Sequence, residues 1–326
     1  MSEKQPLISI VIPVKNGEYW MDKCLGGIMS QTLFPQCEII VIDSGSTDKT
    51  LEILKSYPVK VIGIQPETFN HGLTRNLGVA NSIGKYVVMT VQDAVAADNL
   101  WLQKMLDGFH LAGNVAAVCG KQVVPHDNDK NPADWYRPMA KGEAKAYSFS
   151  KEAFANLSPA EKRNVCGWDD VTAMYLRDVL IETPFRKTSF AEDAQWAKDA
   201  YMNGYTLVYN PEAIVHHYHY ENPDYTYKRT FTVLYHMYRF FGNLPETYQP
   251  GLIDTLRLVK LLFNEAKLSS AEKIKWFRYN QKLRAVYAKT IADFLNIVKQ
   301  GEDVLDKQHE LLCGVPPVAP EKIITG

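Results

Sequence analysis

Short apolar runs alternate with amphipathic stretches along the first 95 residues. Four apolar runs have the length of strands and cover 7–12, 37–42, 59–64 and 85–91. The stretches between them show helical periodicity at 18–30, 47–56 and 72–82. Short strands that alternate with helices indicate βαβ units, so the pattern predicts an α/β fold with a mostly parallel sheet flanked by helices.

The pattern changes character twice in the rest of the chain. A helix at 98–112 and a strand at 115–124 lead into 125–165, a polar region that we interpret as a long loop or partly helical insertion rather than sheet. Ordered elements are then predicted at 171–181, 191–203, 205–209 and 213–216. Beyond 222 the sequence pattern is helical, and further helices are predicted at 251–267 and 271–300. We therefore expect one α/β domain over 1–221 and a helical C-terminal extension over 222–326.

Composition narrows the class of protein. The chain has 326 residues, is 46% hydrophobic and carries a formal net charge of -1, which argues against a nucleic-acid-binding protein. Its five cysteines are scattered, odd in number and without metal-type spacing, as in a protein with reduced thiols. Residues 1–6 lack the apolar core of a signal peptide, and no apolar run reaches 18 residues. We expect a cytoplasmic protein.

Two predicted strands end in polar turns. The run 40–50 is an apolar strand that ends at Asp43 and Ser44, before a helix for which Ser46 or Thr47 is the expected N-cap. The strand before it ends in Pro13-Val-Lys-Asn16. Carboxyl ends of parallel strands are where open α/β sheets bind ligands, so both turns belong to a candidate site.

Strand–Pro-x-x-Asn followed by strand–Asp-Ser-Gly-Ser-Thr-Asp closely resembles the N-terminal half of the family 2 glycosyltransferases, which have the Rossmann-like GT-A fold. The resemblance implies a nucleotide-sugar site containing Pro13, Asn16, Asp43 and Ser44. In this family the aspartate that ends the second strand contacts the base, and a carboxylate can accept the imide N–H of uracil or thymine. A turn aspartate is the alternative for Asp43.

A second motif, Phe69-Asn-His-Gly72-Leu-Thr-Arg75-Asn, precedes or opens a helix. Backbone N–H groups at a helix start and the guanidinium of Arg75 suit an anion, so Arg75 is predicted to bind the diphosphate. A solvent-exposed arginine is the alternative. The motif resembles that of bacterial rhamnosyltransferases of family 2, and this resemblance alone suggests rhamnose as the sugar.

Val91-Gln92-Asp93 stands where the family carries its Asp-x-Asp metal motif, but the first aspartate is missing. Rhamnosyltransferase-like members commonly read Gln-Asp-Ala here, as this chain does. The resemblance implies that Gln92 and Asp93 belong to the nucleotide-sugar site. Asp93 is the expected ligand of Mg²⁺ or Mn²⁺, which would neutralise charge on the diphosphate.

Three histidines follow the last predicted strand, at 216, 217 and 219. Alternation along a strand places His217 and His219 on one face and His216 on the other. Family members carry a histidine after Ala-x-Val-x, which selects His217 as the second protein ligand of the metal. His219 is predicted to be an auxiliary ligand or an acceptor contact.

Phe190-Ala-Glu192-Asp193 resembles the Glu-Asp motif that opens an acceptor-side helix in the family. Its aspartate is the general base of inverting members, so the resemblance implies this role for Asp193 and a supporting role for Glu192. Adjacent acids that favour a helix N-terminus are the alternative.

The segment Gly167-Trp168-Asp169-Asp170 lies where related enzymes line the boundary between donor and acceptor. Trp168 could stack on a sugar ring, and Asp169 or Asp170 could bind hydroxyl groups. A buried tryptophan with a capping aspartate is an equally good interpretation of the same residues.

The C-terminal helices interleave aromatic and basic side chains, as in Lys273-Ile-Lys-Trp276-Phe-Arg278. They can pack as a core or as a dimer layer, or lie against the inner face of the membrane, where lipid-linked acceptors reside. Packing with homodimer formation is the interpretation we favour from the sequence.

Together these features predict an inverting, metal-dependent hexosyltransferase. The resemblance suggests L-rhamnose from a dTDP-linked donor, with a UDP-linked donor as the other choice, and a bacterial surface glycan or lipid-linked glycan as acceptor. A catalytically silent sugar-nucleotide-binding or scaffold module is the alternative, because one metal aspartate is missing. A nucleotide-dependent dehydrogenase would need a glycine-rich first turn, which Pro13-Val-Lys-Asn16-Gly17 does not supply.

Overall fold

The computed structural model describes residues 5–135 and 142–312, which form two compact units. Unit 1 contains residues 1–123 and 140–217, and unit 2 contains residues 124–139 and 218–326. The division expected from the sequence was a single cut after residue 221. The structure instead groups the segment that follows the sixth strand with the C-terminal helices.

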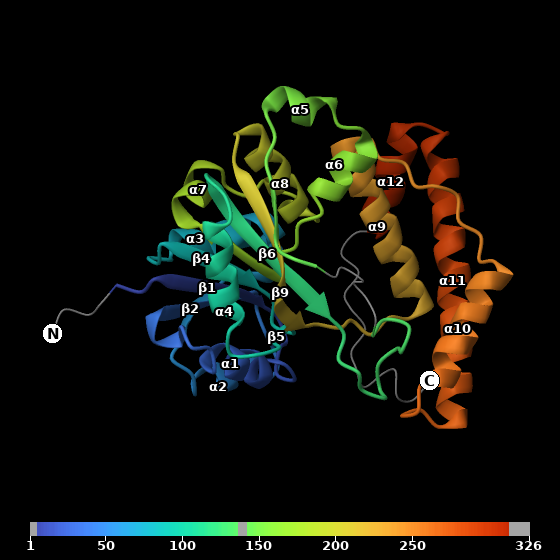
Figure 1. Cartoon of the computed structure of the whole chain (residues 1–326), viewed down its shortest axis with the longest axis horizontal. Coiled ribbons are helices and arrows are strands. Elements are labelled where there is room, and N and C mark those ends of the chain that lie inside the picture. Colours follow the sequence, from blue (N-terminus) through green and yellow to red (C-terminus); the bar gives the residue numbers. More distant parts are fainter. Residues whose placement is uncertain (1–4, 136–141, 313–326) are drawn as a thin grey trace. The chain divides into compact units, whose positions relative to one another are not determined.

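Unit 1 is built on a nine-stranded sheet. Its strands are β1 (Ile8–Val14), β2 (Cys37–Asp43), β3 (Lys60–Gly63), β4 (Tyr86–Thr90), β5 (Val95–Ala96), β6 (Val115–Val123), β7 (Lys145–Tyr147), β8 (Thr172–Leu176) and β9 (Thr206–His216). Their order is β3-β2-β1-β4-β8-β6-β9-β5, and β7 also pairs with β9. Figure 1 labels β1, β2, β4, β5, β6 and β9 of this sheet. The first four strands are parallel, as the sequence pattern predicts. Antiparallel pairs join β8 to β4 and β6, so the sheet as a whole is mixed.

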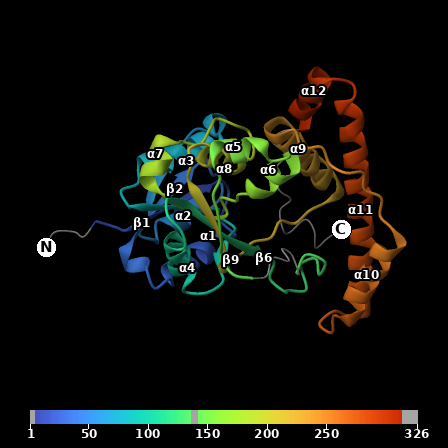
Figure 2. The ribbon, with the colours of Figure 1, turned by 45° about the horizontal axis from the view of Figure 1, so that its top comes forward.

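Helices lie on both faces of this sheet. They are α1 (Met21–Met29), α2 (Thr50–Leu54), α3 (His71–Ala80), α4 (Trp101–Asp107), α5 (Lys151–Asn156), α6 (Pro159–Val165), α7 (Arg177–Glu182) and α8 (Glu192–Met202). The apolar sides of α1 and α4 pack against one side-chain face of β1, which includes Ile10 and Ile12. Gly78 of α3 packs directly on Val11, whose side chain points to the other face because strand residues alternate. Helix α5 packs against α8 (Figure 2).

Two local predictions are wrong. Residues 145–147 form β7, although 125–165 was expected to contain no sheet; residues 136–141 of that region lie outside the described residues. The helix expected at 47–56 begins at Thr50 with Lys49 as N-cap, not Ser46 or Thr47. The carboxylate of Asp48 accepts the Thr50 N–H at 3.0 Å, which satisfies one of the donors that a cap would otherwise take.

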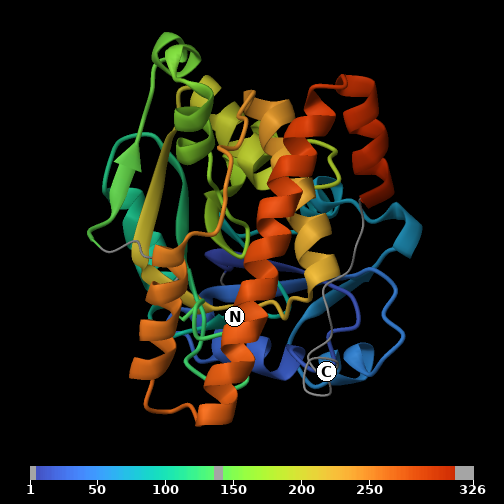
Figure 3. The ribbon, with the colours of Figure 1, turned by 90° about the vertical axis from the view of Figure 1, so that its right-hand side faces the viewer.

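Unit 2 is helical. Its helices are α9 (Pro223–Phe241), α10 (Leu252–Asn264), α11 (Ser270–Val298) and α12 (Glu302–Leu312). Figure 3 shows α11 as a long helix with α10 beside one end and α12 beside the other. Among the described residues, no helix is both long and apolar enough to cross a membrane.

Two apolar clusters hold unit 2 together. Around Phe231 and Phe294, α9, α11 and α12 bury side chains against one another. Around Trp276, α10 and α11 pack with Trp135 from the segment that follows β6. The buried side-chain amides of Asn131 and Asn280 bond to each other at 2.8 and 3.1 Å, which fixes that segment to α11. Much of the aromatic content of the C-terminal helices is therefore core.

Candidate active site

The loops after β1, β2 and β4, here called the strand-end loops, are joined by side-chain-to-backbone hydrogen bonds. Asn16 Oδ1 accepts the Thr47 N–H at 2.9 Å, and the Asn16 N–H donates to Ser46 Oγ at 2.9 Å. Gln92 accepts the Lys15 N–H at 2.9 Å and donates to the Lys15 carbonyl at 3.3 Å. Because three loops share these bonds, the polar groups at the ends of the three strands form one rigid rim.

Asn16 takes an unusual backbone conformation to make these contacts. Its φ is 51°, in the left-handed region, which asparagine tolerates better than most residues. Pro13, three residues earlier, lies beyond Val11, the last residue of β1 that pairs with β4. Its missing N–H therefore leaves no gap in that ladder.

Asp43 ends β2 in a tight turn of its own. Its carboxylate accepts the Gly45 N–H at 3.1 Å and the Ser46 N–H at 3.2 Å, and the side chain is 4% exposed. Ser44 is buried and donates its hydroxyl to the Val14 carbonyl at 3.0 Å. Both residues thus fix the turn. Each carboxylate oxygen has two lone pairs, so Asp43 keeps capacity for a further donor.

Asp93 and His217 come together through the pairing of β5 with β9. Val95 lies opposite His216 in that ladder, and the His217 N–H continues the bonding to Val123. As a result, Asp93 Oδ1 lies 3.5 Å from His217 Nε2, close enough for both atoms to bind one metal ion. His219 follows two residues later and belongs to unit 2, whose second stretch begins at Tyr218.

Gln122 on β6 fixes the orientation of the His217 ring. Its amide nitrogen donates to the carboxylate of Asp169, an acceptor only, so its oxygen must face the histidine. That oxygen lies 2.6 Å from His217 Nδ1. A neutral His217 therefore carries its proton on Nδ1 and presents the Nε2 lone pair to Asp93. In metal sites, a histidine ligand is commonly oriented in this way, by a hydrogen bond from the ring nitrogen that does not bind the metal.

The motif around Arg75 docks α3 onto the segment before α8. Asn76 exchanges two bonds with the Phe185 backbone, at 2.8 and 3.0 Å, and Asn70 Nδ2 donates to the Thr188 carbonyl at 2.8 Å. Gly72 lies so close to the Arg186 carbonyl that a Cβ would stand 2.1 Å from its oxygen. The backbone at Gly72 thus closely approaches a neighbouring backbone segment.

Arg75 is buried, at 5% exposure, among the acidic side chains of Asp170, Glu192 and Asp193, here called the carboxylate cluster. Its guanidinium lies 2.7 Å from Asp170 and 2.7 Å from Glu192. Burial alone would lower the pKa of Arg75, but Glu192 and Asp170 outweigh it and raise that pKa. The predicted contact of Arg75 with a diphosphate stays a prediction, whereas two ion pairs to carboxylates are observed.

Asp170 and Asp193 differ in their surroundings. Asp170 is 2% exposed and accepts a hydrogen bond from the Tyr175 hydroxyl, and burial raises its pKa to about 7 despite the charge of Arg75. Asp193 is partly exposed and accepts the Ala194 N–H at 2.7 Å. Burial, together with Glu192 and Asp170, raises the pKa of Asp193 well above its usual range. Asp193 is thus a half-buried residue whose carboxyl group is more basic than that of an ordinary aspartate.

The backbone before α8 is strained. Ala191 has a φ of 56° and a ψ of 39°, a left-handed conformation that costs an ordinary residue about 1 kcal/mol or more. This turn sets the start of α8, from which Glu192 reaches Arg75 and Asp193 reaches the Asp170 N–H at 3.4 Å. Outliers of this kind cluster at functional sites.

Trp168 and Asp169 have partners within unit 1. The Trp168 ring is half-buried, and its Nε1–H donates to the Tyr175 hydroxyl at 2.8 Å. Asp169 accepts the Val171 N–H at 2.8 Å as well as the bond from Gln122. Gln122 and Tyr175 had not been singled out in the sequence, because a polar residue on a strand carries no spacing that marks its partner.

Comparison with known proteins places this arrangement in a family. Residues 9–183 match the family Glycosyl transferase family 2. The chain is 31% identical to the O-antigen chain rhamnosyltransferase RfbN of Salmonella typhimurium over 231 residues, 69% of this chain and 70% of that protein. It is 32% identical to the O-antigen chain rhamnosyltransferase WbaN of Salmonella anatum over the same length, 69% and 70% of the two chains.

Among solved structures, the mannosyltransferase PcManGT of Pyrobaculum calidifontis, determined in complex with GDP-Man and Mn²⁺, has a TM-score of 0.56. It is 16% identical, and the match covers 94% of this chain and 88% of that chain. At this identity the likeness concerns the fold, which is the GT-A fold. With the family match over residues 9–183, it follows that the chain belongs to glycosyl transferase family 2 and is a glycosyltransferase.

Proposed function

We propose that this protein transfers a hexose with inversion, using a divalent metal ion, to a growing bacterial surface glycan. L-rhamnose from a dTDP-linked donor is the proposed sugar, with a UDP-linked donor as the other choice. The support is twofold: the motifs at 69–76 and 92–94 resemble those of rhamnosyltransferases, and both Salmonella relatives carry that activity in their names. A glycan or lipid-linked glycan is the corresponding acceptor.

The observation that carries the mechanism is the position of Asp193. An inverting transfer needs one carboxylate that removes the proton of the acceptor hydroxyl as that oxygen attacks the anomeric carbon. Asp170 and Glu192 are both ion-paired to Arg75, whereas Asp193 is partly exposed and has a raised pKa. Increased basicity suits a general base, because the proton transfer then has a larger driving force.

The residues present fit a metal ion. Asp93 supplies a carboxylate oxygen and His217 a ring nitrogen that Gln122 orients toward it, which is a donor set that Mn²⁺ or Mg²⁺ accepts. An ion held there would supply positive charge to the leaving diphosphate. His219, two residues after His217, is the proposed auxiliary ligand or acceptor contact.

The strand-end loops are the proposed nucleotide site. Asp43 would accept the imide N–H of the base, while Pro13, Asn16, Ser44 and Gln92 keep the rim in shape. Arg75 and Glu192 then act chiefly by holding the carboxylate cluster together. Trp168, Asp169 and Asp170 remain the proposed boundary between donor and acceptor. A cytoplasmic location follows from the nucleotide-linked donor.

Asp193→Asn tests the mechanism. The substitution removes the base but keeps the shape of the side chain, so turnover should fall by roughly 10²–10⁴-fold while donor binding stays nearly unchanged. Turnover is read as nucleoside diphosphate release, and donor binding by calorimetry. Asp178→Asn, at an exposed position in the first turn of α7, is the matched control and should keep full turnover.

The pH dependence gives a second measurement. A base must be ionised, so kcat/KM should fall as the pH drops through the raised pKa of Asp193, well above the pH at which an ordinary aspartate titrates. A variant Asp193→Asn with near wild-type turnover would exclude this residue as the base. Donor binding without any turnover in the wild type, across thymidine-, uridine- and guanosine-linked sugars, would favour the silent binding module instead.

A further inference from the structure

Helix α10 of unit 2 is apolar on two sides, although the described residues bury only one of them. Leu258 and Leu262 are buried, each at 2% exposure, in the cluster with Trp135 and Trp276. A surface helix usually has one apolar stripe and a polar opposite face. In α10 the side away from the cluster is apolar as well, which indicates a second apolar partner.

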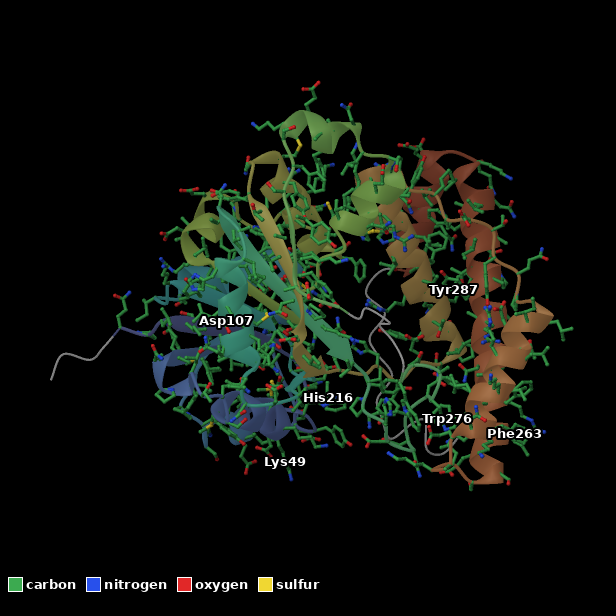
Figure 4. All side chains as sticks on the ribbon, in the orientation of Figure 1. Lys49, Asp107, His216, Phe263, Trp276 and Tyr287 are labelled. Carbon is green, nitrogen blue, oxygen red and sulfur yellow. The ribbon has the colours of Figure 1, made fainter. Side chains whose placement is uncertain are left out.

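The outer face of α10 consists of Leu252, Ile253, Leu256, Arg257, Lys260 and Phe263. At 3.6 residues per turn these six positions fall within an arc of about 140°, and Leu258 and Leu262 fall on the other side of the helix. The four apolar members are between 58% and 75% exposed. Phe263 of the outer face is 73% exposed, whereas Trp276 of the buried cluster is 2% exposed; both residues are labelled in Figure 4.

The stretch of chain that contains this face is strongly basic. Residues 251–284 contain eight lysines and arginines against three acidic residues, a net charge of +5 in a chain whose total is -1. Exposed apolar and cationic side chains continue onto α11, where Ile274 is 54% exposed and Arg278 is exposed. Lys273 Nζ lies 5.8 Å from the centre of the Phe263 ring, so cations and apolar groups are interleaved at the helix ends.

We propose that the outer face of α10 docks on an anionic lipid surface. The apolar side chains would enter the boundary between headgroups and acyl chains, while lysine and arginine side chains reach back to the phosphates. A second copy of this chain is a poorer occupant, because a two-fold contact would set one +5 segment against another. The sequence favoured packing and a dimer for these helices; packing accounts for α9 and α11, but not for this face.

Sedimentation with vesicles tests the proposal on the full chain, and it needs neither donor nor acceptor, so its outcome is independent of the proposed function. Vesicles of phosphatidylglycerol and phosphatidylcholine should bind the protein at low salt. Vesicles of phosphatidylcholine alone should bind far less, and high salt should release the protein because exposed charges are then screened.

Two substitutions and a matched pair separate this face from the rest of the unit. Lys260→Gln removes one cation near the surface and should weaken partitioning about fivefold. Phe263→Ser should weaken it several-fold even at low salt. Lys307→Gln and Leu311→Ser, at exposed positions of α12, change the same kinds of side chain elsewhere and should have little effect.

The mass of the protein in solution distinguishes a lipid surface from a second copy of the chain as the partner of this face. A single-chain mass with salt-sensitive binding that both α10 substitutions weaken supports the lipid surface. Absence of vesicle binding by the wild type overturns the proposal. A double mass that Phe263→Ser reduces to a single one also overturns it, and identifies a second copy as the partner.

Discussion

The strand-end loops and the carboxylate cluster both concentrate polar groups in unit 1, but they stabilise them in different ways. In the loops, Asp43 and Asn16 accept hydrogen bonds from backbone N–H groups, so the turns are held by neutral donors. In the cluster, Asp170 and Glu192 share one buried guanidinium. A change in the loops should therefore have a limited effect, whereas the loss of Arg75 leaves two buried acids without their cation.

Arg75→Met should give the largest effect on stability. Removing one partner of a buried ion pair typically costs 3–5 kcal/mol, so the free energy of unfolding should fall by about that amount. Arg186→Met is the matched control, since Arg186 also pairs with an aspartate but is 63% exposed. That variant should lose at most about 1 kcal/mol. Urea denaturation measures both, and equal losses would contradict the comparison.

A triple variant separates the cluster from the diphosphate. Arg75→Met combined with Asp170→Asn and Glu192→Gln removes the cation together with the two charges it balances, so most of the lost stability should return. If Arg75 also binds the diphosphate, calorimetry will still show weak donor binding in this variant. Donor affinity that recovers with stability would assign Arg75 a structural role alone.

Gln122→Met addresses the proposed metal site, because Gln122 joins Asp169, the neighbour of Asp170, to His217, which faces Asp93. Methionine keeps the volume but loses both hydrogen bonds, so the His217 ring is no longer held toward Asp93. Mn²⁺ affinity, followed by electron paramagnetic resonance of the free ion, should fall roughly 10–100-fold. Gln103→Met, at a half-buried position of α4 where the amide donates to Asp107, should leave it unchanged. Wild-type affinity in Gln122→Met would show that His217 needs no such support.

Asn16→Ala should give the smallest effect and tests the strand-end loops. The variant loses the bond to the Thr47 N–H and places alanine at a positive φ, which together should cost about 1 kcal/mol of stability. Asn114→Ala is a close match, with a φ of 56° and one side-chain bond, to the Gly204 carbonyl. Both should lose similar stability, but only Asn16→Ala should weaken binding of a nucleoside diphosphate. Equal binding in the two variants would remove Asn16 from the site.

The sequence predicted the four parallel strands well, because they are short, mainly apolar runs and helices separate them along the chain. Strand β7 escaped prediction because Lys145, Ala146 and Tyr147 are all exposed and join the sheet by backbone pairing alone. The start of α2 was misplaced because Ser46 Oγ and the Thr47 N–H form hydrogen bonds with Asn16, thirty residues away in the chain, instead of capping the helix. Rules for helix caps use only neighbouring residues and therefore cannot predict such a long-range bond.

The site was predicted less completely than the fold. The resemblance to family 2 singled out Asp93, His217 and Asp193 as site residues, which stays a prediction. It could not show what Arg75 would face, since a guanidinium at a helix start suits a phosphate and a carboxylate equally. Asp170 and Glu192 lie 95 and 117 positions beyond Arg75, and only the packing of α3 against the segment before α8 brings them to it. Gln122 could not be inferred, because its two partners come from different strands and loops.

The contact at Gly72 has a consequence for engineering. Because no side chain fits between α3 and the Arg186 carbonyl, and Asn70 and Asn76 bond to the same stretch, residues 69–76 and 183–193 form a single mechanical part. A chimaera that imports residues 183–193 from a relative, in order to test whether they influence the choice of acceptor, should therefore import both stretches together. Exchanging one stretch alone would place new side chains against a partner segment that fits only the original ones.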